Sequence, residues 1–470
     1  RLGVNAGNSI ASGGNYNVTV GDEAGTAITT GDRNVTIGFE AGTAISTGGA
    51  NIAIGYQALK TEDGHGLNVA IGEEALETLN AGADGYNVAV GALAGKNMTT
   101  GTFNTLVGGL AGDALTDADK NTAIGYAALG ADTLGSLSTA VGRMALTSQN
   151  FTTATDTYNV AVGHNAGLLV TTGVQNTIIG GLAGDALTDA DFNIAIGTYA
   201  LTSDTLGSRS VAIGRSALQA QNFTTATDSY NVAVGHEAGG AVTTGVNNTL
   251  IGSLAGDALT EGGNNTALGI NALGADTLGS RNTAIGYQTL LVQNFTSATN
   301  SYNVAIGHDA GRAVTTGVQN TFIGGLAGDG TDDGDANVAV GYAALSNNSG
   351  DRNTAVGAGA LTSSTGSDNT FMGRSAGLVL SSGIKNTGVG AYALDAETSG
   401  SFSTAVGYAA LGTQNVGGGA VVHNTAVGYS AGLAVTTGLN NTLIGSLAGD
   451  ALTDADRNVA LGYAALSSDT

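Results

Sequence analysis

Three histidines, His164, His236 and His308, recur 72 residues apart. Imidazole nitrogens bind zinc at about 2 Å, so this regular spacing raises the question of a metal site. In the repeat described below, four coils separate neighbouring histidines, which corresponds to about 19 Å at roughly 4.8 Å per coil. Histidines within one chain therefore cannot share an ion, although three copies of the chain could bring equivalent ones together. A solvent-facing column of variable residues explains them better, because Tyr126 and Arg143 occupy the equivalent position elsewhere.

An acidic segment, Asp-Ala-Leu-Thr-Asp-Ala-Asp, recurs at 113–119, 185–191 and 450–456. Carboxylate oxygens are the ligands that Ca²⁺ prefers, so the segment is a candidate calcium site. The ligands would be Asp113, Asp117, Asp119, Asp185, Asp189 and Asp191. No EF-hand or Gly-x-Asp calcium nonapeptide accompanies them, and solvated acidic turns are the simpler interpretation. We therefore expect no cofactor.

Three Asn-Phe-Thr segments have the form of N-glycosylation sites, at Asn150, Asn222 and Asn294. Each lies in a longer coil that ends in a tyrosine just before the next strand. Exposed aromatic rings stack on sugar rings, so these loops are the predicted ligand contacts, although the rings could instead pack beneath the loops. The aromatic residues concerned are Phe151, Tyr158, Phe223, Tyr230, Phe295 and Tyr302.

The sequence shows no catalytic constellation. The chain has no Cys, no Gly-x-Ser-x-Gly elbow in a suitable context, and no His near a matching Ser and Asp. Some β-solenoid glycosidases use facing carboxylates about 5–10 Å apart, but pairs such as Asp332 and Asp333 sit in Gly-rich turns, where solvation explains them. The chain is therefore not expected to be an enzyme.

All of these residues are positioned by one five-residue pattern: polar, β-branched, usually small, aliphatic, Gly. It occurs 26 times between Asn17 and Asn458, mostly at steps of 17 residues, with four steps of 21 that end at 159, 231, 303 and 424. A four-repeat block of 72 residues recurs three times over 87–302. Because fixed short periods indicate repeat architectures, residues 1–470 are interpreted as one continuous array, cut inside a repeat at both ends.

The pattern predicts a short strand followed by a backbone corner at Gly. A 17-residue period is too short for a helical hairpin and fits one coil of an all-β, parallel β-solenoid. Asn at the first position would form a ladder of amides from coil to coil. Ladder residues include Asn159, Val162, Gly163, Ala166, Asn176, Gly180, Asn231 and Gly235.

Second and fourth positions are apolar or Thr and are expected to line the coil interior. Third and fifth positions are mostly Ala and Gly and are expected to face outward, so bulky third-position residues would be buried against a neighbouring chain. These residues include Leu106, Ile178, Leu250, Phe322, Phe371 and Leu443.

The ninth position is Gly in 13 repeats and Leu in 13, and it predicts the twelfth. Gly167 at the ninth goes with Val170 at the twelfth, whereas Leu201 goes with Asp204. Because a packed interior tolerates neither overpacking nor voids, each coil is expected to hold one large apolar side chain in this region.

The composition excludes several classes of protein. The formal net charge of −23 argues against binding nucleic acid or an anionic membrane surface. No run approaches 18 apolar residues, so no membrane insertion is expected. Gly accounts for 78 residues while Pro is absent, which excludes collagen.

The sequence Asn-Thr-Ala-Val-Gly-Tyr-x-Ala at 424–431, matched at six positions by 353–360, resembles the head repeats of trimeric autotransporter adhesins. Similar repeats occur in bacteriophage tail fibres, and the resemblance covers essentially the whole chain. It implies a left-handed parallel β-roll assembled as a homotrimer, located extracellularly on a cell surface or virion. The 17-residue period and the 21-residue coils depart from the adhesin pattern.

Three functions are compatible with these observations. The first is a structural and adhesive extracellular fibre, the shaft or head of an adhesin or tail fibre. The alternative is an extracellular filament of subunits stacked end to end, and the least favoured is a polysaccharide-degrading tail spike. The expected partners are copies of the chain itself, as a homotrimer or filament, and a cell-surface glycan or host receptor.

Overall fold

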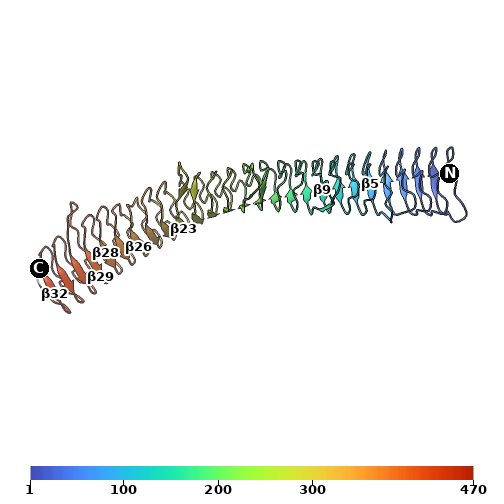
Figure 1. Ribbon diagram of the computed structural model, residues 1–470. Coiled ribbons are helices and arrows are strands. Elements are labelled where there is room, and N and C mark those ends of the chain that lie inside the picture. The colour runs from blue at the N-terminus through green and yellow to red at the C-terminus, as the bar shows by residue number, and fades with distance from the viewer. Residues whose placement is uncertain (1, 469–470) are drawn as a thin grey trace. The chain divides into compact units, whose positions relative to one another are not determined.

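The computed structural model describes residues 2–468, and every regular element in them is a short β-strand (Figure 1). Each coil of about 17 residues contributes one three-residue strand, formed by the second to fourth positions of the repeat. The predicted all-β parallel β-solenoid is therefore confirmed. No helix in the described residues is long and apolar enough to cross a membrane.

The coils form two compact units, the first ending at His236 and the second beginning at Glu237. In the first unit, 13 three-residue strands line one face of the coils. They are β1 (Val18–Val20), β2 (Val35–Ile37), β3 (Ile52–Ile54), β4 (Val69–Ile71), β5 (Val88–Val90), β6 (Thr105–Val107), β7 (Thr122–Ile124), β9 (Thr139–Val141), β11 (Val160–Val162), β12 (Thr177–Ile179), β13 (Ile194–Ile196), β15 (Val211–Ile213) and β17 (Val232–Val234).

The second unit has the same construction, again with 13 three-residue strands. They are β18 (Thr249–Ile251), β19 (Thr266–Leu268), β21 (Thr283–Ile285), β23 (Val304–Ile306), β24 (Thr321–Ile323), β25 (Val338–Val340), β26 (Thr354–Val356), β27 (Thr370–Met372), β28 (Thr387–Val389), β29 (Thr404–Val406), β30 (Thr425–Val427), β31 (Thr442–Ile444) and β32 (Val459–Leu461).

Within each unit the strands pair in parallel, and like positions of the repeat stand opposite one another. In the first unit, Val160 of β11 pairs with Thr139 of β9 on one side and Thr177 of β12 on the other. In the second, Phe322 of β24 lies between Ala305 and Ala339. The register is therefore set by the repeat itself, and each column of the sequence becomes a column on the solenoid.

The burial of the strands reverses the face expected from the sequence. In all 26 three-residue strands the middle residue is buried, whereas the second and fourth positions are half-buried or exposed, as at Val160 and Val162 around Ala161. The coil interior is thus lined by the first, third, eighth, ninth, twelfth and fifteenth positions. Alternation defines two faces of a strand but does not say which is inside, and a narrow coil accommodates the Ala side chains.

Consequently, the bulky third-position residues are not available to a neighbouring chain. Leu106, Ile178, Leu250, Phe322, Phe371 and Leu443 are each 0% exposed within a single chain. The expectation that they are covered by another chain was wrong. They fill their own coils.

The ninth position explains how these coils are filled. Its backbone is left-handed whether it holds Gly or Leu, with φ of 56° at Gly112 and 54° at Leu129. A Cβ added at Gly112 would lie 2.7 Å from Leu115 Cδ1 and 2.9 Å from Leu106 Cδ2. Gly is therefore required at the ninth position of coils in which the third and twelfth positions supply the large side chains. The predicted relation between the ninth and twelfth positions thus involves the third position as well.

Candidate functional site

The first-position asparagines connect each coil to itself and to the next. Asn176 donates from Nδ2 to the carbonyl of Ala190 at 2.8 Å, across its own coil. Its Oδ1 accepts the backbone N–H of Asn193 at 2.9 Å, and its own N–H donates to Asn159 Oδ1 at 2.9 Å. The side chain is fully buried. Because buried polar groups must be paired, this column acts as structural scaffolding.

A buried acid and a buried glutamine accompany every 21-residue coil. The glutamine is the twelfth residue of the long coil, and the acid is the twelfth residue of the coil before it. All eight side chains are fully buried. The pairs are Asp132–Gln149, Asp204–Gln221 and Asp276–Gln293, each at 2.6 Å, and Glu397–Gln414 at 2.9 Å.

The first pair shows the full network. Asp132 Oδ1 accepts the backbone N–H of Gly135 and of Phe151, both at 3.1 Å, and Oδ2 accepts Gln149 Nε2. Gln149 also donates to Ser138 Oγ at 2.8 Å and accepts from Asn159 Nδ2 at 2.9 Å. The carboxylate therefore anchors the start of the long loop to the preceding coil.

These acids were missed by the sequence reasoning. The sequence shows a polar twelfth position beside a ninth-position Leu, and the signal that marks these acids is a Gln at the twelfth position of the longer coil that follows. Burial raises the pKa of the Asp276 carboxyl, although hydrogen bonds from Gln293, Gly279 and Phe295 oppose that shift. The network is thus a satisfied structural core rather than an accessible reactive group.

The long loops divide the predicted ligand contacts into two groups. Phe151, Phe223 and Phe295 are each only 6% exposed and pack beneath the loops. The tyrosines at the ends of the same coils are about half exposed: Tyr158 at 55%, Tyr230 at 53% and Tyr302 at 46%. Only the tyrosines can contact a ligand without rearrangement of the loop.

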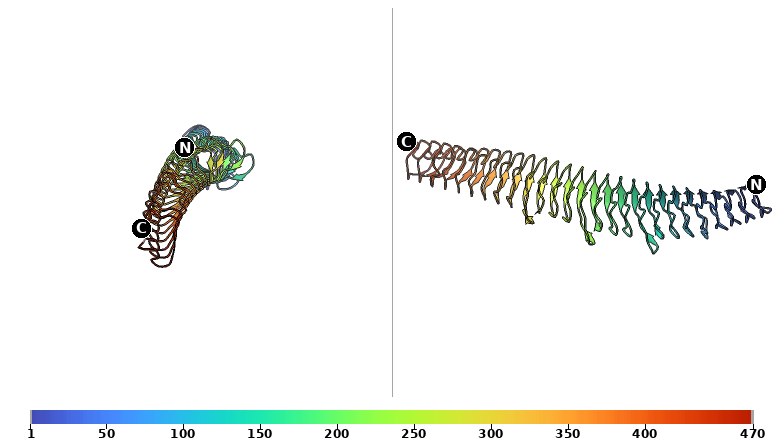
Figure 2. Two further views of the ribbon diagram at one scale, coloured as in Figure 1. Left: turned by 90° about the vertical axis from the view of Figure 1, so that its left-hand side faces the viewer. Right: turned by 90° about the horizontal axis from the view of Figure 1, so that it is seen from above.

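The loops extend beyond the edge of the coils, as the teal, green and yellow loops in the right-hand view of Figure 2 show. Each returns by pairing with the preceding coil. β8 (Gly135–Ser136) pairs with β10 (Thr155–Asp156), β14 (Gly207–Ser208) with β16 (Thr227–Asp228), and β20 (Gly279–Ser280) with β22 (Thr299–Asn300). Asn150, Asn222 and Asn294 are exposed there, so their glycosylation stays a prediction.

The three tyrosines belong to a longer column that the sequence analysis did not recognise. It consists of the residue immediately before each first position, always in a left-handed conformation, as at Tyr158 with φ of 51°. At one point in it a cation lies between two rings: the Arg209 guanidinium lies 4.8 Å from the Phe192 ring and 5.9 Å from the Tyr230 ring. Seven of the 14 Lys and Arg residues lie in this column: Arg33, Lys120, Arg209, Arg281, Arg352, Lys385 and Arg457.

Five of the six candidate calcium ligands serve as links between coils. Asp119 Oδ1 accepts the Thr102 N–H at 2.7 Å, and Asp191 Oδ1 accepts the Val174 N–H at 2.7 Å. Asp117 and Asp185 accept threonine hydroxyls, and Asp189 accepts one at 2.6 Å. Burial raises the pKa of Asp113. Among residues 2–468 these carboxylates are not brought together in a group of three.

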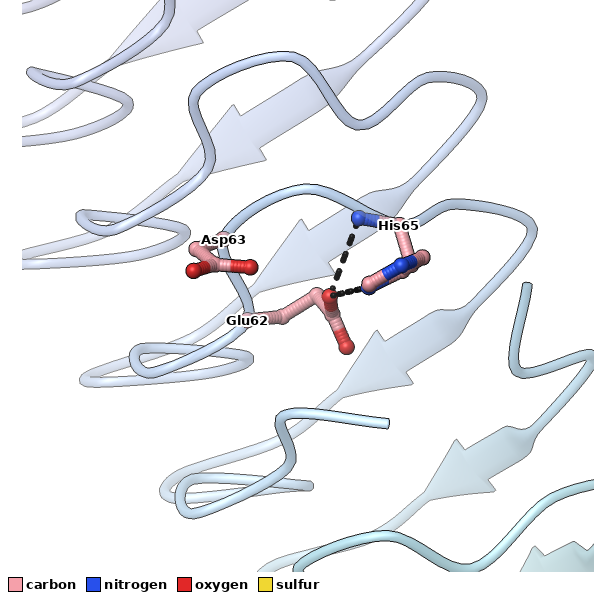
Figure 3. A group of neighbouring side chains, drawn as sticks. All are labelled: Glu62, Asp63 and His65. Carbon is pink, nitrogen blue, oxygen red and sulfur yellow. Dashed lines mark hydrogen bonds and ion pairs between the residues drawn. The ribbon is translucent and has the colours of Figure 1, made fainter. Parts of the chain in front are cut away.

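One group in the described chain brings three metal-ligating side chains together: Glu62, Asp63 and His65 offer atoms within 4.8 Å of one another. Figure 3 shows that the Glu62 carboxylate is already engaged by His65. Its Oε1 accepts the His65 N–H at 3.1 Å and lies 3.5 Å from Nδ1, and its Oε2 accepts the Ala81 N–H at 3.2 Å. A cation would have to displace these bonds.

The regularly spaced histidines are exposed. His164 Nε2 lies 3.3 Å from an Arg143 nitrogen, and the His308 ring stacks on Tyr287 with centroids 5.2 Å apart. They form part of a surface column, and their meeting around an axis between chains stays a prediction.

No protein-family model matches the chain, and no curated protein matches it. The β-solenoid is therefore established by the structure, without support from a known relative.

Proposed function

We propose that the chain is the shaft or head of an extracellular fibre, assembled as a homotrimer on a cell surface or virion, that presents ligand-binding side chains at intervals. The observation that supports this proposal is the apolar character of the outward face of the three-residue strands. Second and fourth positions form a stripe of Val, Ile and Thr along each unit, with Leu or Met at three fourth positions of the second unit. Ile179 and Ile323 are 36% and 38% exposed, and Met372 is 45% exposed.

A stripe of β-branched residues that continues from coil to coil is an unusual surface for a chain with a net charge of −23. Contiguous exposed apolar patches mark interaction sites. Three copies of the chain packed through this stripe would bury it, while the loops and corners of the coils stay accessible. Such a fibre would act through reach and multivalency.

The test is the oligomeric state of the intact chain. Sedimentation and negative-stain images should show trimers of limited length. Ile179→Lys with Ile213→Lys should dissociate them, because each trimer would bury charges on the stripe. Leu169→Lys is the matched control, since Leu169 is 46% exposed at an eleventh position, off the stripe. A monomeric wild type, or filaments of indefinite length, would refute the trimer, and the latter would favour end-to-end stacking.

A further inference from the structure

A groove of about 350 Å³ lies beside the turns that follow the strands of three consecutive coils in the second unit. Its volume lies at the lower end of the range for small-molecule sites, roughly 300–1,000 Å³. It is lined by Tyr392, Asp395, Tyr408, Gly412, Thr413 and Leu433, together with Ala409.

Two tyrosine rings form one side of the groove. Tyr392 and Tyr408 have ring centroids 5.7 Å apart and planes at 81°, so they make a corner instead of a continuous stack. Tyr408 is held from the other direction by Tyr429, stacked at 5.5 Å and 11°. Arg374 lies 4.9 Å from the centre of the Tyr392 ring. Each ring thus packs against a further side chain outside the corner, while Tyr408 is still 49% exposed.

The floor is formed by a residue without a side chain. A Cβ added at Gly412 would lie 3.2 Å from Leu433 Cδ1 and 3.5 Å from Asp395 Oδ1. The carboxylate and the leucine therefore stand on either side of the space above Gly412. Burial raises the pKa of the Asp395 carboxyl, against a hydrogen bond from its own backbone.

The same floor occurs at Gly274, where a Cβ would lie 3.4 Å from Leu291 Cδ1 and 3.5 Å from Asp257 Oδ1. There, however, Leu254 and Ile270 occupy the positions of Tyr392 and Tyr408. The tyrosine corner is what distinguishes the groove at Gly412 from an ordinary coil surface.

We propose that this groove binds one neutral pyranose residue of a glycan, with its apolar face against the tyrosine corner and its hydroxyls on Asp395 and Thr413. Aromatic faces suit the C–H face of a sugar because they exclude water on one side, and a carboxylate accepts hydrogen bonds from adjacent hydroxyls. Asp395 and the net charge of −23 disfavour an anionic sugar. The proposal deepens the adhesive role and rests on it.

The experiment uses ligand-observed saturation-transfer NMR on the full chain. The probes are the methyl glycosides of glucose, galactose, mannose and N-acetylglucosamine, with N-acetylneuraminic acid as the anionic probe. At least one neutral probe should receive saturation. Gly412→Ala, which fills the floor, and Tyr408→Ala should each weaken binding at least tenfold. Gly274→Ala and Tyr342→Ala, at an equivalent floor and at a 65% exposed tyrosine, should leave it unchanged.

Absence of transfer to every neutral probe, binding of the anionic sugar alone, or binding that persists in Gly412→Ala and Tyr408→Ala would overturn the proposal. The adhesive fibre is judged separately, by trimer formation and by attachment of the chain to cells. Trimers that attach equally well with Gly412→Ala would refute the groove and leave the fibre standing. A monomer that binds the sugar through the groove would do the reverse.

Discussion

Exchanging the buried acid and glutamine beneath the first long loop gives a sharp test of the interior network. In Asp132→Asn, Oδ1 still accepts the N–H groups of Gly135 and Phe151. The new amide nitrogen, however, replaces Asp132 Oδ2, which in the wild type accepts from Gln149 Nε2 at 2.6 Å. Two donors then face each other. Turning the Gln149 amide over would set two donors against each other at Asn159 instead. One buried donor stays unsatisfied either way, which costs about 1–3 kcal/mol.

The single variant Gln149→Glu should be worse. It places two like charges within hydrogen-bonding distance in a fully buried site. A buried charge left without a compensating partner costs about 3–5 kcal/mol. In the exchange Asp132→Asn with Gln149→Glu, the new carboxylate accepts from the amide introduced at position 132, from Asn159 and from the Ser138 hydroxyl. The clashes of both single variants are removed, so the double variant should regain most of the lost stability.

The assay is native-state hydrogen exchange at the Phe151 amide, because stability in a repeat array is a local quantity. The free energy of local opening should be similar in the wild type and in the double variant, lower in Asp132→Asn and lowest in Gln149→Glu. Asp156→Asn, an exposed carboxylate of the same loop, is the control and should change nothing. A double variant that is no more stable than Gln149→Glu would refute the reasoning.

The filling of the coils predicts that Phe322→Ala costs about 3–5 kcal/mol and that Gly328→Leu alone also destabilises, because a Cβ there would lie 2.4 Å from Phe322 Cδ1. The double variant should recover much of the lost stability, since other coils combine Ala at the third position with Leu at the ninth. Urea unfolding of the wild type, the two single variants and the double variant measures the free energy of unfolding. Additive losses in the double variant would contradict this prediction. The raised pKa of Asp276 means that the folded state binds a proton more readily than the unfolded state between pH 3.8 and the folded pKa. This residue's contribution to stability should therefore rise as the pH falls through that window, and calorimetry from pH 7 to pH 4 should show a smaller rise of the melting temperature in Asp276→Asn than in wild type. An equal rise in both would remove Asp276 as its source.

Much of the fold was predictable because the repeat is short and the coils stack in register. The strand at the second to fourth positions and the parallel pairing follow from periodicity, and the pairing of Val160 with Thr177 is one step of the period. The exchange of Gly and Leu at the ninth position could be inferred as packing, since volume compensation within one coil is visible in a sequence. The third member of that exchange, the residue in the middle of the strand, could not be seen while it was assigned to the outer face.

The candidate sites were much less predictable. Phe151 and Tyr158 belong to the same loop, yet one ring packs beneath it and the other is exposed, and composition does not separate the two cases. The sugar-binding groove depends on Tyr392, Asp395 and Leu433, which become neighbours of Tyr408 and Gly412 only through the stacking of coils. Their separations of 16, 17 and 21 residues each lead from one coil of the repeat to the next, but the sequence does not show that these side chains surround an open space.

By itself, the sequence determined the period, the parallel strands, the glycine corners and the compensation between the ninth and twelfth positions, because each is a property of residues 17 apart or closer. Only the tertiary structure decided which face of the strand is inside. With it came the buried acid–glutamine pairs, the apolar stripe on the outside and the groove at Gly412. The physical reason is that a three-residue strand has two chemically plausible faces, and closure of the coil selects the one whose side chains, Asn and Ala, fit the narrow interior.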